Sequence, residues 1–297
     1  MLPWIDAASL RSALDYPSAV EALRQAYAGA FQVPPRSQVD LLDNGGRMWL
    51  MPAAAAGSLG VKLVTQFDSN AARGIDRIQG VYVYLDGETG QPLALLDGRA
   101  ITEIRTAAVS ALATRLLANP TPDRGITLGV FGHGVQGRAH IAAMRACFNI
   151  RETRICESDP SKSTATAAEC AAADLICVCT TSRTPVIDGN LLRPGTHINA
   201  IGNSRPDGRE LDTATVARSR LAVDSREGVM AEAGDLLMPM AEGAIDASHI
   251  LADLPELARG EKIVRQSPAD ITLFKAVGFA LGDLALARLA YQKWSAR

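Results

Sequence analysis

The sequence lacks several features that mark common functional classes. Its 30 lysines and arginines are balanced by 32 acidic residues, so no basic excess is available to hold a nucleic acid backbone. No uncharged apolar run reaches the roughly 18 residues that a membrane span requires. The histidines form neither HExxH nor a cluster with cysteines or acids at metal-ligand spacing, and no cysteines have CxxC spacing. We therefore expect no nucleic acid partner, no membrane span and no metal site.

The composition indicates a globular protein of a reducing compartment. The chain has 297 residues, of which 47% are hydrophobic, enough for the core of one large domain or two ordinary ones. Cys177 and Cys179 lie in an apolar run, where residues two apart on a strand share one face, as buried thiols do. The segment MLPWIDAASLR has no basic start and reaches Asp6 early, which argues against a signal peptide. We expect a cytoplasmic protein.

Two helical patterns flank the first part of the chain. Residues 6–31 show helical periodicity, with Asp6 and Ser18 as candidate N-caps. A second helical pattern follows Thr102 and ends at Asn119-Pro120, because the residue before a proline disfavours the helical conformation.

Between these helices the pattern predicts an antiparallel meander. Short apolar runs alternate with turn residues: RSQVDLLD, RMWLMP, GVKLVTQF, IQGVYVYLD and PLALLDG. Asn44-Gly45 and the segment GETG supply the expected turns. Residues 1–118 therefore have the pattern of an α+β domain.

From residue 119 the pattern changes to short buried strands alternating with helices. ITLGVF, TRICES, ADLICVCTT, GTHINAIG and RLAVDS are apolar runs bounded by turn residues, as in a parallel sheet. Only one helix fits between SDP at 158–160 and AADLICV at 172–178, so the third strand usual in such a sheet is expected to be missing. Glu210 and Asp212 precede a short helix pattern and are interpreted as caps.

The sequence thus predicts an α/β fold made of two domains. A Rossmann-type domain spans 119–274, and an α+β domain combines 1–118 with 275–297. Ser267-Pro268-Ala269-Asp270 is expected to start a C-terminal helix that packs on the first domain or on a second subunit.

The segment GVFGHGVQGRAH sets Gly132, Gly134 and Gly137 at GxGxxG spacing between a predicted strand and a predicted helix. This context puts a tight turn and a helix N-terminus where a dinucleotide pyrophosphate binds. The motif also requires an acid at the end of the next strand, about 20 residues on, and Glu157 occupies that place. Because a carboxylate repels a 2′-phosphate, and Ser158 rather than an arginine follows, NAD is favoured over NADP.

These residues resemble the ornithine cyclodeaminase and mu-crystallin superfamily, whose members are nicotinamide-dependent enzymes acting on α-amino or α-imino acids. The resemblance covers most of the chain and implies an N-terminal substrate-binding and dimerisation domain, completed by the C-terminal helix, and a homodimer. It is carried by GVKLVTQFDSN, QGVYVYLDGETGQPLALLDGRAITEIRTAA, GHGVQGRAH, CTTSRTPVIDG, GTHINAIG, VDSREGVMAEAGDLLMP and FKAVGFALGD.

The resemblance also implies roles for individual residues. Arg36, in VPPRSQ, clamps the substrate carboxylate, and Lys62 is the central active-site lysine. Arg105 is a second basic contact, shared by substrate and cofactor, and Val277 matches a position that touches substrate. Beside the glycine turn and Glu157, the implied cofactor-binding set contains Val135 and Gln136 at the pyrophosphate, and Thr180, Ser182, Asn199 and Ile201 on the nicotinamide side.

Elementary chemistry agrees with three of these roles. Strand alternation puts Lys62 on the inward face with Val64, and a buried lysine can titrate near neutral pH, as an acid/base group must. Arg105 lies in the first half of its helix, where the macrodipole disfavours a cation, so an anion is expected beside it; a structural salt bridge is the alternative. Arg36 follows Pro34-Pro35, whose fixed φ limits its motion, and a guanidinium suits a bidentate carboxylate.

The sequence departs from the family pattern at functional positions. The cyclodeaminase pattern has an aspartate two residues after the glycine of INAIG, where this chain has Ser204, with Asn203 before it. Neither can act as a general base without help, so cyclisation of ornithine is disfavoured. His133 lies inside the glycine turn and Ala276 replaces a usual serine, and both bear on cofactor contacts.

We therefore predict an NAD(P)-dependent oxidoreductase acting on C–N bonds. It would reduce an α-imino acid (a ketimine) to an α-amino acid, or catalyse the reverse dehydrogenation, on cyclic ketimines such as pyrroline-2-carboxylate or on small acyclic imino acids. Two alternatives stay open. One is an ornithine cyclodeaminase, which releases proline and ammonia, and the other is a non-catalytic, nucleotide-dependent binder of a small molecule.

Overall fold

The computed structural model describes residues 2–41, 45–119 and 125–296, and the chain divides into two compact units. The first unit combines residues 1–105 with 280–297, and the second spans 106–279. The boundaries differ from the expected ones because α3 (Gly98–Leu117) continues into the second unit, where Asn199 donates to Thr114. Residue 275 likewise belongs to a strand of the second unit.

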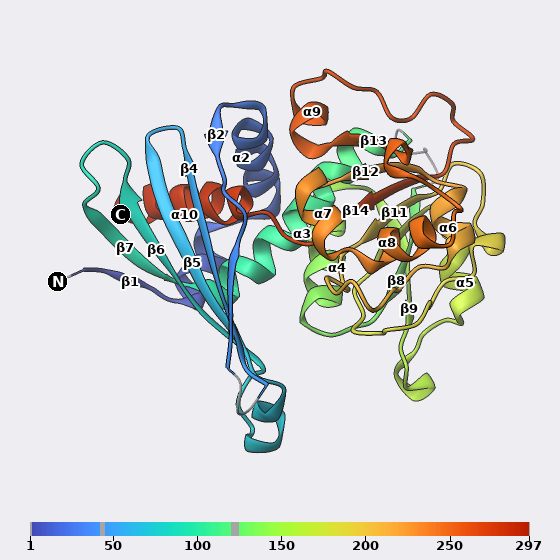
Figure 1. The fold of residues 1–297 in the computed structure, drawn as a ribbon, viewed down its shortest axis with the longest axis horizontal. Helices are drawn as coiled ribbons and strands as arrows, with labels where there is room; N and C mark the ends of the chain where they lie inside the picture. Colours follow the sequence, from blue (N-terminus) through green and yellow to red (C-terminus); the bar gives the residue numbers. More distant parts are fainter. Residues whose placement is uncertain (1, 42–44, 120–124, 297) are drawn as a thin grey trace. The chain divides into compact units, whose positions relative to one another are not determined.

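The first unit contains the predicted antiparallel meander (Figure 1). Its sheet has the strand order β1-β7-β6-β5-β4-β2, with β3 paired to β4. The strands are β1 (Trp4–Ile5), β2 (Phe31–Gln32), β3 (Ser37–Asp40), β4 (Arg47–Ala55), β5 (Ser58–Gln66), β6 (Ile78–Asp86) and β7 (Pro92–Asp97). All neighbours are antiparallel except β1, which runs parallel to β7. The predicted Asn44-Gly45 turn lies partly outside the described residues.

Three whole helices, the start of α3 and a short 3-10 segment, η1 (Asp68–Arg73), complete the described part of this unit. The side chain of Asp6 caps α1 (Ala7–Ala13), as predicted. The cap of α2 (Tyr16–Ala28) is Asp15 instead of Ser18, because Ser18 donates its backbone N–H to the Asp15 carboxylate. The C-terminal α10 (Ala280–Ser295) packs on α2 and across β4 and β5 (Figure 1).

The second unit is a Rossmann-type layer of parallel strands, which confirms the predicted α/β fold. Strand order is β13-β12-β14-β11-β10-β8-β9, with every pair parallel. The strands are β8 (Ile126–Phe131), β9 (Ile150–Cys156), β10 (Leu175–Val178), β11 (His197–Ala200), β12 (Arg220–Val223), β13 (Ile250–Asp253) and β14 (Thr272–Lys275). Because β9 is the edge strand next to β8, the predicted absence of a further strand on that side is borne out among the described residues.

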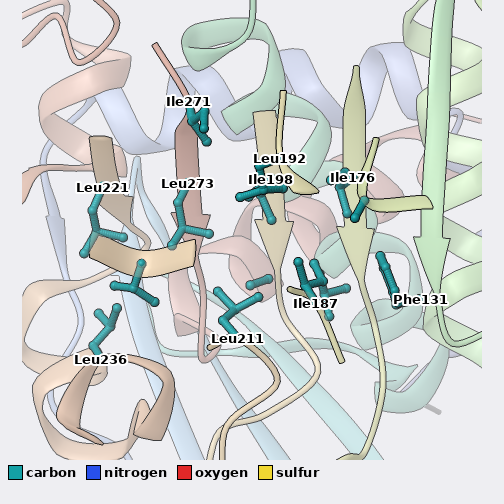
Figure 2. Close-up of a cluster of buried hydrophobic side chains, with 14 of the residues drawn as sticks. Phe131, Ile176, Ile187, Leu192, Ile198, Leu211, Leu221, Leu236, Ile271 and Leu273 are labelled. Carbon is teal, nitrogen blue, oxygen red and sulfur yellow. The ribbon is translucent and has the colours of Figure 1, made fainter. Parts of the chain in front are cut away.

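Short helices connect these strands. They are α4 (Val135–Cys147), α5 (Ala167–Ala171), α6 (Thr213–Ala217), α7 (Arg226–Glu232), α8 (Gly234–Ala241) and α9 (Leu254–Ala258), with 3-10 turns η2 (Pro160–Lys162), η3 (Gly189–Leu191) and η4 (Ala247–His249). Buried side chains from neighbouring strands, among them Phe131, Ile176, Ile198, Leu221 and Leu273, meet Leu236 of α8 in one cluster (Figure 2). This core holds the carboxyl ends of the strands in fixed register. No helix within the described residues is both long and apolar enough to cross a membrane.

The predicted helix start at Ser267-Pro268-Ala269-Asp270 is wrong. The Asp270 carboxylate accepts from the backbone N–H groups of Gln266 and Ser267, which closes a turn that leads into β14. Strand β14 is buried between β11 and β12, and this burial overrides the local helix-start pattern. The helix begins at Ala280 instead. It packs on the first unit, which is one of the two alternatives predicted for it.

Candidate active site

Lys62 lies in the middle of β5 with 1% of its surface exposed. It is paired with Met51 of β4 and Tyr82 of β6. Its Nζ lies 2.9 Å from both carboxylate oxygens of Asp283 and 3.2 Å from Oγ1 of Thr102. The inward orientation predicted from strand alternation is therefore correct.

Asp283 is a site residue that the sequence reasoning missed. It lies in the first turn of α10 with none of its surface exposed, and it also accepts from Nε of Arg105 at 3.2 Å. An anion beside Arg105 was expected, but its identity was not. The available signal was an isolated carboxylate in the otherwise uncharged run AVGFALGDLALA at 276–287. A buried charge of this kind requires a partner.

The surroundings of Lys62 hold its ammonium group close to its titration point. Burial lowers the pKa of Lys62 to about 8, Asp283 opposes the shift, and the positive charges of Arg105 and Arg36 reinforce it. A lysine with this pKa exchanges its proton near physiological pH, which a general acid or base must do.

The same group of residues offers positive charge to an anion. Arg105 is 8% exposed, and only its Nε contacts Asp283 among the described residues, which leaves its two terminal amino groups for another acceptor. Arg36 is half-buried, and its Cζ lies 5.9 Å from the centre of the Trp49 ring. Two guanidinium groups near one buried ammonium suit a small carboxylate ligand.

The glycine turn of the second unit has the geometry that its spacing predicts. Gly132 has a φ of +84°, and a Cβ there would lie 2.9 Å from the carbonyl oxygen of Cys179. A Cβ on Gly137 would lie 1.9 Å from the carbonyl oxygen of Gly132, so only glycine lets α4 approach β8 this closely. Gly134, the N-cap of α4, has no side-chain cap and faces open space. The following residues Val135, 52% exposed, and Gln136, half-buried, begin the helix.

Glu157 is located where the dinucleotide fingerprint requires an acid. It directly follows β9, and its Oε1 accepts from the backbone N–H of His133, in the glycine turn, at 2.6 Å. The carboxylate and the uncapped N-terminus of α4 are thus brought to one edge of the sheet. This arrangement fits a nucleotide, with hydroxyl groups at the acid and a pyrophosphate at the helix.

The remaining predicted residues follow the adjacent strands β10, β11 and β14. Thr180 and Ser182 lie after β10, and the Ser182 backbone N–H donates to Oγ1 of Thr180. Ile201 and Val277 are half-buried and follow β11 and β14. Asn199 is different, since it lies inside β11, fully buried, with Nδ2 bonded to Thr114.

One of the two residues interpreted as caps has another role. Asp212 caps α6, but Glu210 is fully buried and caps no helix, because its side chain binds the loops after β10 and β11. Ser204, at the position of the family aspartate, is exposed.

Comparison with known proteins agrees with this geometry. The sequence profile described as the ornithine cyclodeaminase/mu-crystallin family matches residues 7–297. The Δ1-pyrroline-2-carboxylate reductase of Colwellia psychrerythraea is 32% identical over 97% of this chain and 98% of its own. The ketimine reductase mu-crystallin of Mus musculus is 34% identical over 90% of this chain and 87% of its own.

A solved structure is also similar to this chain over its whole length. The Δ1-pyrroline-2-carboxylate reductase of Thermococcus litoralis, in complex with NADH and L-proline, superimposes with a TM-score of 0.93 at 34% identity. The match covers 100% of this chain and 98% of that one. With a family profile over nearly the whole length and relatives above 30% identity, the chain belongs to the ornithine cyclodeaminase/mu-crystallin family.

Proposed function

We propose that this protein is an NADH-dependent reductase that converts an α-imino acid to the corresponding α-amino acid, and that it also catalyses the reverse dehydrogenation. The observation that carries the proposal is the buried Lys62, with its lowered pKa, bonded to Asp283 beside Arg105. This is a proton donor next to groups that bind a carboxylate. The relatives named above, two of them reductases of pyrroline-2-carboxylate and one a ketimine reductase, support the same chemistry.

On the substrate side, Arg36 and Arg105 bind the carboxylate and orient the imine carbon. Lys62 donates its proton from Nζ to the imine nitrogen and regains one from solvent, while the two oxygens of Asp283 hold Nζ in place. Val277 lines the substrate. Reduction is balanced because the carbon of the C=N bond gains a hydride and the nitrogen gains a proton, which gives the amine.

The cofactor side belongs to the second unit. NADH, when bound, supplies the hydride from C4 of its nicotinamide ring. The turn at Gly132, Gly134, Val135 and Gln136 would hold the pyrophosphate, and Glu157 would bind the adenosine ribose hydroxyls. Arg105, Thr180, Ser182, Asn199 and Ile201 are the residues proposed for the nicotinamide end. The Glu157 carboxylate favours NADH over NADPH, because it would repel a 2′-phosphate.

The domain roles follow from this division. We assign substrate binding and dimerisation to the domain that contains Lys62, and dinucleotide binding to the domain that contains Gly132. Assembly as a homodimer in the cytoplasm is part of the same proposal. Light scattering coupled to size-exclusion chromatography tests the assembly, since a monomer mass at working concentration would contradict it.

The experiment that tests the function is oxidation of NADH and NADPH against a panel of imines. The panel contains pyrroline-2-carboxylate, piperideine-2-carboxylate, and pyruvate, glyoxylate or oxaloacetate with ammonia or methylamine. Turnover of an imine, faster with NADH than with NADPH, is expected. Ornithine serves as the opposing substrate, because release of proline and ammonia from it, with no imine reduced, would replace the reductase by a cyclodeaminase. Tight binding of NADH and imine without turnover would favour a binding protein.

A further inference from the structure

Glu210 joins two loops of the second unit through a single carboxylate. Its Oε1 accepts from the backbone N–H and from Oγ1 of Thr180, both at 2.7 Å, and its Oε2 accepts from the backbone N–H of Asn203 at 2.7 Å. Thr180 follows β10 and Asn203 follows β11, which are neighbouring parallel strands. One side chain, with none of its surface exposed, therefore fixes the spacing of the two segments that leave the sheet at its carboxyl edge.

A second layer of buried charges holds Glu210 itself. Asp235, in α8, accepts from the backbone N–H groups of Glu210 and Leu211 at 2.6 and 2.9 Å. Its other oxygen accepts from Nζ of Lys275, at the end of β14, at 2.6 Å. The same Nζ donates to the carbonyl oxygen of Asn203 at 2.6 Å, so the peptide groups on both sides of Asn203 are held. Asp235 and Lys275 have no exposed surface.

Glycines allow the loops to pack this closely. A Cβ on Gly202 would lie 2.2 Å from the carbonyl oxygen of Thr180 and 2.4 Å from Oε1 of Glu210. A Cβ on Gly132, in the glycine turn, would lie 3.2 Å from Cγ2 of Thr180. The loop that Glu210 holds therefore packs directly against the predicted cofactor turn. In doubly wound sheets, ligands bind at this carboxyl edge of the strands.

We propose that Glu210 is a positioning residue for the nicotinamide end of the cofactor, acting through the loops that contain Thr180 and Asn203. This inference rests on the proposed use of NADH. Glu210 makes no described hydrogen bond to the N-terminus of α4 or to Glu157, so we expect its main effect at the nicotinamide end of the dinucleotide. The adenosine end keeps its own contacts.

The charges of the network support a functional role. Two buried carboxylates, Glu210 and Asp235, lie near one buried ammonium, Lys275. The negative charges of the cluster therefore exceed the positive charges when both acids are ionised. Burial raises the pKa of Glu210 to about 7, Asp235 reinforces the shift and Lys275 opposes it. A carboxylate has two accepting oxygens, one for each loop, which a neutral amide cannot supply, and the protein keeps this acid although an unbalanced buried charge costs stability.

The test compares two ligands that differ at the nicotinamide end. NADH and ADP-ribose share the adenosine and the pyrophosphate, but ADP-ribose lacks the nicotinamide. In Glu210→Gln of the full chain, the new amide NH₂ cannot accept from the backbone N–H of one loop. We expect the Kd of NADH, measured by calorimetry, to rise about tenfold, or about 1.4 kcal/mol, while the Kd of ADP-ribose changes by less than about twofold.

Further variants separate positioning from general damage. Glu242→Gln makes the same chemical change at a carboxylate that pairs with Arg209, at the surface, and should leave both Kd values unchanged. Glu210→Asp keeps the carboxylate but is one methylene shorter, so it cannot reach both Thr180 and Asn203, and it should weaken NADH selectively. This variant provides the test even where Glu210→Gln does not fold.

The emission of bound NADH gives a second readout, since a nicotinamide that is no longer held should fluoresce like free NADH. An equal loss of NADH and ADP-ribose binding in Glu210→Gln, or no loss of either, would overturn the positioning role. Unchanged NADH binding by Glu210→Asp would do the same. Wild-type protein that binds ADP-ribose but not NADH, or neither, would instead overturn the proposed cofactor, and this inference with it.

Discussion

Replacement of Asp283 by asparagine should move the titration of Lys62 to lower pH. The amide keeps the size of the side chain but removes the negative charge that lies 2.9 Å from Nζ of Lys62. Arg105 and Arg36 then act on the ammonium without opposition, and both already lower the pKa of Lys62. The expected change is therefore a further decrease of that pKa.

The size of the change follows from the energy of the pair. Breaking a buried ion pair by removing one partner costs about 3 to 5 kcal/mol. Because Lys62 can escape part of this cost by releasing its proton, we take about 3 kcal/mol, or about two pKa units. The pKa of Lys62, about 8 in the wild type, would become about 6 in the variant. At about pH 8 the protonated fraction would fall from about one half to about one hundredth.

The assay is the pH dependence of kcat/KM for imine reduction. A required proton donor makes kcat/KM fall as the pH rises through its pKa, so the wild-type limb should lie near pH 8 and the Asp283→Asn limb about two units lower. At about pH 8 the variant should be roughly 50-fold slower, and at about pH 6 only about twofold slower. Glu103→Gln, which removes a surface partner of Arg11, is the matched control and should leave the profile unchanged. An Asp283→Asn enzyme with a lower plateau but an unmoved limb would refute the role of Lys62 as the proton donor.

Four further predictions concern the same residues. Lys62→Met should reduce kcat by at least about a hundredfold, since general acid catalysis contributes about 10² to 10⁴ in rate. The variant should still bind NADH within about twofold of wild type by fluorescence titration, and substantial turnover would contradict the assignment. Arg36→Lys should raise KM for the imine about tenfold without changing NADH affinity, because an ammonium cannot bind a carboxylate bidentately; an unchanged KM would remove Arg36 from the substrate site. Gly137→Ala should lower the melting temperature, because its Cβ would lie 1.9 Å from a carbonyl oxygen. Gly134→Ala, whose Cβ would meet no atom within 4 Å, should keep the wild-type melting temperature and weaken only the binding of NADH. Equal melting temperatures of the two variants would show that the turn adapts. Burial raises the pKa of Glu210 from 4.5 to about 7. The free energy of unfolding that this shift contributes is complete below pH 4.5 and is lost as the pH rises through about 7. Urea unfolding should show this loss of stability in wild type and less of it in Glu210→Gln, and identical pH profiles of stability would contradict it.

The parts of the fold that the sequence predicts are those with a local cause. The meander strands alternate in hydrophobicity over their own length, and the glycine turn requires positive φ or missing side chains at particular positions such as Gly132 and Gly137. The inward orientation of Lys62 follows from period-two alternation once β5 is recognised. Membership in the family, inferred from the motifs, is confirmed by the profile match over residues 7–297.

The parts that escaped prediction depend on residues far apart in the chain. Lys62 and Asp283 are 221 positions apart, and nothing near either residue encodes the other. Glu210 resembles a cap by its local pattern, but its buried side chain binds Thr180 and Asn203, which follow two other strands. In each of these cases tertiary packing overrides a local preference.

The segment 267–270 shows the same conflict. Its residues match a helix start, but Thr272–Lys275, shortly after it, form the buried strand β14, which fills the place in the sheet between β11 and β12. A pattern confined to four residues carries no information on that place. The true start of α10, at Ala280, lacks such a pattern and is set by the packing of its apolar face on α2 and the antiparallel sheet.

The central claim is that a hydride passes from NADH to an imine carbon at a site where Lys62 supplies the proton. The most direct measurement uses NADH that carries deuterium at C4 in each of its two faces separately, with pyrroline-2-carboxylate as substrate, and mass spectrometry of the product. The account predicts proline labelled at Cα from one face of the cofactor only, and labelled proline formed at least about a hundredfold more slowly by Lys62→Met. Unlabelled proline, or no consumption of NADH with any imine of the panel, would contradict it.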